Sequence, residues 1–137
     1  MSLFYLDSSA LVKIVWDEPE SEVLRAYIDG ADLVSCELVL TEIPRAIRLA
    51  AADDDAMLDT LMARTGDLLD SIALLPLDRP LLLAAGALDH PALRALDAIH
   101  VAAAVALDPV DAFVGYDERQ SAAARLAGLR TVAPGGG

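Results

Sequence analysis

The sequence contains very little cysteine and almost no lysine. Cys36 is the only cysteine among 137 residues, so no disulfide bond can form within the chain. Lys13 is the only lysine among the 10 basic residues, and the others are arginines. A chain of this length usually forms one domain, with a core large enough to be stable without disulfides or bound zinc. We therefore expect one domain in a reducing environment.

Long apolar segments are also missing. The longest stretch without a charged residue runs from Ala98 to Leu107, and a helix needs about 20 apolar residues to cross a bilayer. The first residues include Asp7 and no basic residue before Lys13, a pattern unlike that of a signal peptide. The sequence therefore predicts a cytoplasmic protein with no membrane association.

Basic residues are scarce relative to acidic ones. The chain has 10 Lys and Arg against 22 Asp and Glu, which gives a formal net charge of -12. Proteins that coat nucleic acid by neutralising its phosphates are usually basic, so extended coating of this kind is not expected. The hydrophobic fraction of 55% and the charged fraction of 23% argue against a disordered chain.

Short apolar segments alternate with helical segments along the whole chain. The expected strands are 3–6, 33–35, 72–77, 112–116 and 130–132; the expected helices are 10–16, 21–29, 38–52, 53–70, 79–88, 92–107 and 118–127. The strands are apolar on both faces, which is typical of a mainly parallel sheet covered by helices on both sides. We therefore expect an α/β domain over 1–133 and a mobile glycine-rich tail over 134–137. Ser8 or Ser9 is expected to cap the first helix.

Four carboxylates stand at positions where a buried charge needs a partner. Asp7 and Asp117 directly follow the first and fourth expected strands, and ligands of parallel sheets bind at the carboxyl ends of strands. Glu42 and Asp97 lie in otherwise apolar helices. Each has a purely structural alternative. Asp7 and Asp117 could cap helices, Glu42 could interact with a helix dipole, and Asp97 could pair with Arg94 one turn away.

Taken together, the four carboxylates indicate a divalent cation. Crowded carboxylates raise one another's pKa, and a hard cation such as Mg²⁺ or Mn²⁺ relieves that repulsion. Zinc is not expected, because Cys36, His90 and His100 lack ligand spacing. The chain also lacks the GxxxxGK[ST], GxGxxG and GxSxG motifs. A carboxylate-held ion in a small α/β domain most naturally serves phosphoryl chemistry with an activated water.

Three segments resemble the motifs of PIN-domain ribonucleases, and in particular those of VapC-type toxins. Residues 6–13 (LDSSALVK) resemble the opening motif, and residues 93–102 (LRALDAIHVA) are similar to the family segment LRxLDAIHLA. Residues 113–119 (FVGYDER) resemble the last motif, and Glu42 falls where the second acidic position belongs. These motifs occur in the family's order and span nearly the whole chain.

The resemblance implies a PIN fold, with a parallel sheet of about five strands in the order 3-2-1-4-5. It also implies an endoribonuclease that uses one or two Mg²⁺ or Mn²⁺ ions and acts as the toxin of a type II toxin–antitoxin pair. The residues implied to be both catalytic and metal-binding are Asp7, Glu42, Asp97 and Asp117. Ser9 would hold Asp7 in place. Arg94, expected on one helix face with Asp97, would contact RNA or orient that carboxylate.

The resemblance further implies a homodimer and a complex with a VapB-type antitoxin, which inserts a segment into an apolar groove near the site. Trp16, with Val12 and Val15, would line that groove or belong to the core. His100, one turn after Asp97, is expected to pack or form a hydrogen bond rather than transfer protons. Two other functions remain open: a PIN-fold binding module without catalysis, and a metal-dependent phosphatase for small phosphate esters.

Overall fold

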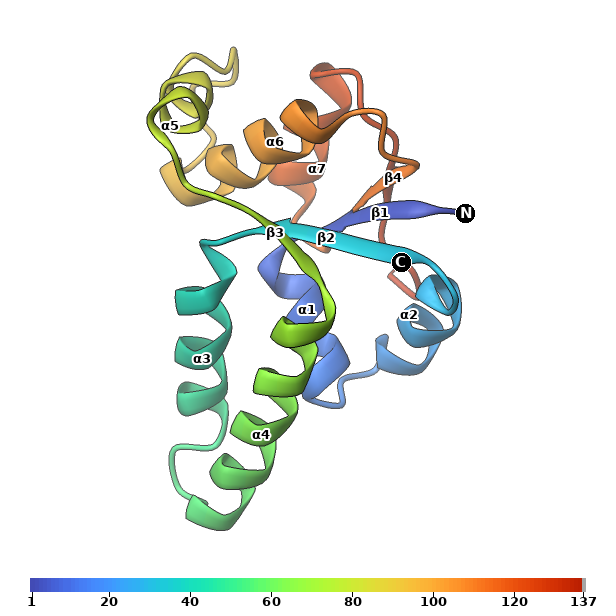
Figure 1. The fold of residues 1–137 in the computed structure, drawn as a ribbon, viewed down its shortest axis with the longest axis vertical. Helices are drawn as coiled ribbons and strands as arrows, with labels where there is room; N and C mark the ends of the chain where they lie inside the picture. The colour runs from blue at the N-terminus through green and yellow to red at the C-terminus, as the bar shows by residue number, and fades with distance from the viewer. Residues whose placement is uncertain (137) are drawn as a thin grey trace.

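A parallel sheet of five strands lies between two layers of helices (Figure 1). The structure is a computed structural model that describes residues 1–136. The strands are β1 (Leu3–Leu6), β2 (Asp32–Cys36), β3 (Ala73–Leu75), β4 (Ala112–Val114) and β5 (Thr131–Val132). They are ordered β3-β2-β1-β4-β5, and every neighbouring pair is parallel. Both the α/β class and the strand order 3-2-1-4-5 are therefore confirmed.

The helices divide between the two faces of the sheet. One face carries α1 (Ser8–Val15), α2 (Ser21–Ile28), α3 (Val39–Ala50) and α4 (Asp55–Ser71), and the other carries α5 (Arg79–Gly86), α6 (Ala95–Leu107) and α7 (Glu118–Leu126). Helices α3 and α4 pack against each other and extend away from the sheet (Figure 1). Within the described residues, no helix has the length and apolar character needed to cross a membrane.

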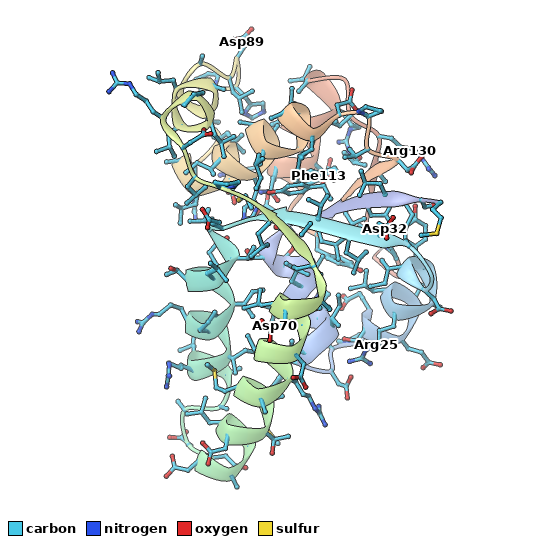
Figure 2. The ribbon with its side chains drawn as sticks, viewed as in Figure 1. Arg25, Asp32, Asp70, Asp89, Phe113 and Arg130 are labelled. Atoms are coloured by element: carbon cyan, nitrogen blue, oxygen red, sulfur yellow. The ribbon has the colours of Figure 1, made fainter. Side chains whose placement is uncertain are left out.

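Each face of the sheet has its own apolar core. Tyr5 of β1 packs in the core beneath α6 and α7, whereas its neighbours Phe4 and Leu6 pack in the core beneath α1 and α3. Phe113 of β4 stacks on Tyr5, with the ring centroids 5.5 Å apart. Figure 2 shows Phe113 inside the fold and the labelled charged side chains at its periphery. These two cores explain why the strands are apolar on both faces.

Two helix starts differ from the expected ones. Asp7, not Ser8 or Ser9, caps α1, because its side chain accepts a hydrogen bond from the N–H of Ala10. The helix expected from residue 92 begins at Ala95, because Arg94 is extended with ψ near 152°. Arg94 therefore precedes α6 and does not share a helix face with Asp97.

The sheet is shorter at its edges than expected. Strand β3 covers three residues and β5 covers two. Beyond β5, Pro134 is buried, and its carbonyl accepts a hydrogen bond from Tyr116 Oη at 2.7 Å. The domain boundary at 133 and the mobility of the tail over 134–137 stay predictions, and Gly137 lies outside the described residues.

Candidate active site

The carboxyl ends of β1 and β4 place two of the four carboxylates at one edge of the sheet. The register pairs Leu6 with Val114, and the N–H of Asp7 donates to the Val114 carbonyl at 3.1 Å. Asp117 follows β4 after a short turn and caps α7. Neighbouring parallel strands end together, so the aspartates after both strands reach this edge.

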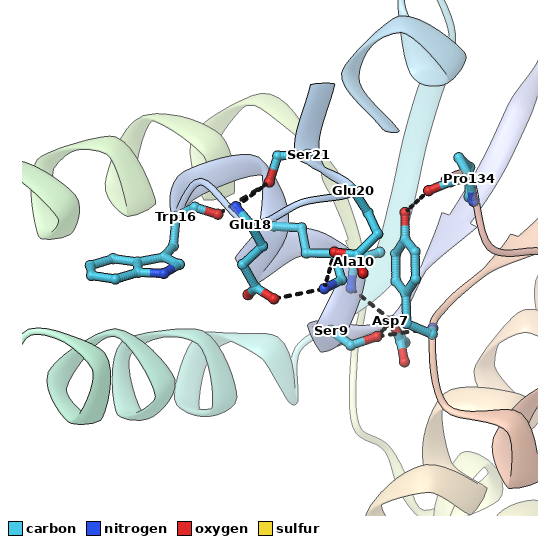
Figure 3. A network of polar contacts seen from close by, with 10 residues as sticks. Asp7, Ser9, Ala10, Trp16, Glu18, Glu20, Ser21 and Pro134 are labelled. Atoms are coloured by element: carbon cyan, nitrogen blue, oxygen red, sulfur yellow. Dashed lines mark hydrogen bonds and ion pairs between the residues drawn. The ribbon is translucent and has the colours of Figure 1, made fainter. Parts of the chain in front are cut away.

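Asp7 is buried and is held by its own helix. Its Oδ1 accepts hydrogen bonds from Ser9 Oγ at 2.7 Å and from the N–H of Ala10 at 3.0 Å (Figure 3). The Ser9 hydroxyl in turn accepts the N–H of Tyr116 at 3.2 Å, which connects α1 to the end of β4. Burial raises the pKa of the Asp7 carboxyl, although the hydrogen bonds from Ser9 and Ala10 oppose this. Gly115 lies against the carboxyl group: a Cβ there would be 3.0 Å from Asp7 Oδ2.

Glu42 comes from α3 and is held by a histidine from the opposite helical layer. His100 of α6 is buried, and its Nε2 lies 2.6 Å from Glu42 Oε1. Its Nδ1 lies 2.8 Å from Tyr5 Oη. Burial alone would lower the pKa of His100, but its contacts with Cys36 and Glu42 outweigh burial and raise the pKa to about 10. His100 is therefore packed and hydrogen-bonded to both oxygens, as expected from the sequence.

Asp97 lies in the first turn of α6, half-buried, near two other acids. Burial raises its pKa, and so do the negative charges of Asp117 and Glu42. Gln120 of α7 connects the two helix starts: its N–H donates to Asp117 Oδ1 at 2.9 Å, and its Nε2 lies 3.4 Å from the Asp97 carbonyl. The structural alternative for Asp97, an ion pair with Arg94, is not seen: no salt bridge joins them among the described residues, and the Arg94 charge opposes the raised Asp97 pKa only as the smallest of its causes.

Two cavities meet at Asp117. One, of about 410 Å³, is lined by Ser9, Lys13, Glu42 and Asp117, among others. The other, of about 370 Å³, is lined by Arg94, Asp97, Asp117 and Arg119, among others. Glu42, Asp97 and Asp117 therefore line two adjoining cavities, each of which also has a cationic side chain in its lining, whereas the buried Asp7 lines neither. Lys13 and Arg119 are the members of these linings that sequence reasoning missed. The only available signal for Lys13 was that the chain has no other lysine.

The carboxylates suit a hard cation in kind but do not form a ready-made cage. Within residues 1–136, no three carboxylate, imidazole or thiol groups are close enough together to hold a metal ion as they stand. Even so, the nearby donors are oxygens, and Asp97 already experiences the charges of Asp117 and Glu42. Oxygen donors in mutual repulsion match Mg²⁺ or Mn²⁺ and not zinc. Side-chain movement would be needed to bring a full set of ligands onto one ion.

Comparison with known families identifies the fold. The PIN domain model matches residues 4–126, which is most of the chain. The chain belongs to the PIN domain family. PIN domains are generally nucleases and typically use a divalent metal ion. No curated protein matches the chain. In this PIN domain the edge of the sheet that carries Asp7 and Asp117 is therefore the candidate active site.

Proposed function

We propose that this PIN domain is a Mg²⁺- or Mn²⁺-dependent endoribonuclease and the VapC-type toxin of a type II toxin–antitoxin pair. One observation carries the proposal. In a fold whose members are generally nucleases, Asp97 experiences the charges of Asp117 and Glu42, and Asp7 is buried at the same edge of the sheet. Negative groups gathered in this way destabilise the fold unless they serve a cation.

Each carboxylate has a role in this proposal. Asp7 and Asp97 bind the ion directly, Glu42 binds it directly or through water, and Asp117 completes the site. Ser9 keeps the Asp7 carboxyl oriented through the hydrogen bond to Oδ1. When bound, the ion lowers the pKa of a water molecule and offsets charge on the scissile phosphate.

The chain's own groups position the reactants. His100 holds Glu42 Oε1, which leaves Oε2 to accept a proton from the attacking water. The water oxygen bonds to phosphorus, and the bond from phosphorus to the 3′ oxygen breaks. The 3′ oxygen takes up a proton from solvent, and Glu42 releases to solvent the proton that it accepted. The products are a 5′-phosphate and a 3′-hydroxyl. Arg94 is exposed at the mouth of the Asp97 cavity, where it contacts RNA phosphate.

A separate cleft suits the antitoxin. It measures about 500 Å³ between α1 and α4, and its lining includes Trp16, Met57 and Leu61. Asp17, Asp54 and Arg64 also line the cleft, which gives its lining a net charge of -1. A VapB-type antitoxin segment with apolar side chains and a basic group fits this cleft by polarity and charge. Val15 also lines the cleft, although it is buried in the core. We also propose that the toxin is a homodimer and joins its antitoxin in a hetero-oligomer.

The decisive experiment compares the wild-type protein with Asp7→Asn, both purified without a partner protein. Each is incubated with RNA and Mg²⁺ or Mn²⁺, with and without chelator. The proposal expects wild-type cleavage that chelator abolishes, and none by the variant. RNA binding without cleavage would favour the binding module. Hydrolysis of a small phosphate ester with RNA left intact would favour the phosphatase.

A further inference from the structure

The only lysine of the chain is buried between two glutamates. Lys13 Nζ lies 2.7 Å from Glu18 Oε2 and 3.1 Å from Glu20 Oε2. It also sits 4.7 Å from the centroid of the Tyr116 ring. Burial alone would lower the pKa of Lys13, but the two glutamates outweigh burial and raise it. The side chain is therefore an ammonium ion held in a fixed place.

This ammonium belongs to the wall of the candidate active site. Lys13 and Glu18 line the 410 Å³ cavity together with Glu42 and Asp117. Among the described residues that line this cavity, Lys13 is the only cation. The cavity on the other side of Asp117 is lined by arginines. Without Lys13, an RNA strand that crosses the carboxylates would therefore meet positive charge on one side only.

The two glutamates are more exposed than the lysine. The side chain of Lys13 is 11% exposed, whereas that of Glu18 is 35% exposed and that of Glu20 is 26% exposed. A carboxylate at that exposure can turn toward water at little cost, because water solvates its charge in place of the ammonium. Lys13 can therefore exchange an internal carboxylate for another anion without leaving its place.

The loop between α1 and α2 does not depend on these ion pairs. Ser21 fastens it through the backbone: the N–H of Glu18 donates to Ser21 Oγ at 2.9 Å, and this hydroxyl donates to the Trp16 carbonyl at 3.3 Å (Figure 3). The carboxylates of Glu18 and Glu20 extend away from that loop (Figure 3) and accept hydrogen bonds from Lys13 of α1. Ser21 therefore anchors the loop without the two carboxylates. The ion pairs of Glu18 and Glu20 with Lys13 are not needed for that purpose and call for another explanation.

We propose that Lys13 receives a phosphate of the RNA substrate, and that Glu18 and Glu20 are internal anions that occupy Lys13 until RNA displaces them. This inference rests on the proposed function. A phosphate oxygen accepts the same charge-assisted hydrogen bond as a carboxylate oxygen, so the two compete for one ammonium. The glutamates thereby weaken RNA binding at a site that is already strongly negative, and they favour substrates that offer a well-placed phosphate.

The test measures binding of a fluorescein-labelled single-stranded RNA by anisotropy, in the Asp7→Asn background so that the RNA stays intact. Lys13→Met should weaken binding roughly tenfold, the value of one charge-assisted contact. Glu18→Gln combined with Glu20→Gln should strengthen binding, by roughly threefold or more. Glu22→Gln combined with Asp29→Asn is the matched control: both residues are exposed, in α2 or at its end, and line neither cavity at Asp117, so this variant reports the effect of removing two negative charges alone.

The proposal predicts that Lys13→Met weakens RNA binding and that the two glutamine substitutions strengthen it. A purely structural role of these ion pairs would weaken RNA binding in both variants or in neither. Lys13→Met should also reduce the slope of log K against log salt by about 0.7, the value for one phosphate contact to a single strand. The proposal is overturned if the variant with Glu18→Gln and Glu20→Gln binds no more tightly than the control with Glu22→Gln and Asp29→Asn. This comparison can be made even if Lys13→Met does not fold. If wild type neither binds nor cleaves RNA, the proposed function itself fails. If wild type cleaves RNA but the variants do not separate, only the role of Lys13 is wrong.

Discussion

His100, which is buried, and Glu42, which is partly exposed, form an ion pair that joins the two helical layers through the edge of the sheet. Nε2 lies 2.6 Å from Oε1, and the histidine side chain is 1% exposed. From the opposite face of the sheet, His100 thereby fixes one carboxylate oxygen of Glu42, a candidate metal ligand. This contact determines how Glu42 presents its second oxygen to the site.

The pair should make stability depend on pH in the alkaline range. The pKa of His100 is raised to about 10 in the folded protein and is about 6.5 in the unfolded chain. A raised histidine pKa stabilises the fold below about 6.5, and this contribution is lost as the pH rises through about 10. The contribution is the difference in unfolding free energy between wild type and Glu42→Gln, measured with urea at several pH values. It should be about 2 kcal/mol near neutral pH and shrink toward pH 10.

The control for this measurement is Glu37→Gln, which removes the charge of an exposed glutamate and keeps the oxygen that accepts the N–H of Leu77. Its difference from wild type should vary little over the same range. A Glu42→Gln difference that stays constant with pH would mean that His100 is neutral in the fold, contrary to the ion pair described here.

Asp7→Asn should make the protein more stable while it abolishes metal binding. Burial raises the pKa of Asp7, so its charged form is unfavourable in the fold. In the presence of chelator, this free-energy penalty grows as the pH rises from the ordinary aspartate pKa through the raised pKa of Asp7. Over that range the folded protein keeps a proton that the unfolded chain has already released. Asparagine keeps the acceptor for Ser9 and Ala10 without the charge. Its melting temperature near neutral pH should rise by roughly 3 °C, for about 1 kcal/mol.

The gain should disappear below the ordinary aspartate pKa, where both variants are neutral at this position. A loss of stability at neutral pH would show that the Asp7 charge is already compensated in the fold without a metal ion. Differential scanning calorimetry in chelator at acidic and neutral pH distinguishes these outcomes.

Local signals were enough to predict the parallel α/β sheet, whereas its strand order followed from the family resemblance. The apolar strands indicate the parallel sheet, and Asp7 and Asp117 become candidate site residues because each directly follows an expected strand. The contact between His100 and Glu42 was not predictable in this way. It joins residues 58 positions apart on opposite faces of the sheet. Only the packed structure brings such groups together, because no periodicity within either helix encodes the partner.

Arg94 shows where pattern reasoning fails. The apolar spacing after residue 92 suits a helix, but a turn closes first, with the N–H of Leu93 donating to the His90 carbonyl at 3.0 Å. Arg94 then lies in extended backbone, and Asp97 becomes a first-turn residue. A shift of three residues in a helix start therefore changed the expected partner of a candidate ligand. Helix ends are sensitive to single turns in this way, whereas helix interiors are not.

Mn²⁺ should stabilise the wild-type protein in proportion to its occupancy. An ion that binds only the folded state adds about 2.7 kcal/mol at a hundred times its dissociation constant. Asp97→Asn should lose most of this gain, because Asp97 is a proposed direct ligand near Asp117 and Glu42. Asp89→Asn is the matched control, since Asp89 is exposed and lies away from both cavities at Asp117. Melting temperatures across an Mn²⁺ titration provide the measurement, and equal gains in the two variants would exclude Asp97 as a ligand.

Gly115→Ala should damage the site while leaving the fold intact. The added Cβ would lie 3.0 Å from Asp7 Cγ and Oδ2, which is tighter than ordinary packing allows, so the carboxyl must shift. A displaced ligand should lower Mn²⁺ affinity and RNA cleavage roughly tenfold to a hundredfold. Gly66→Ala is the control: Gly66 lies in α4 with nothing within 4 Å of an added Cβ, so it should gain about 0.5–1 kcal/mol of stability and keep full activity. Calorimetric Mn²⁺ titration of both variants tests this. Unchanged affinity in Gly115→Ala would mean that the position of the Asp7 carboxyl does not control metal binding.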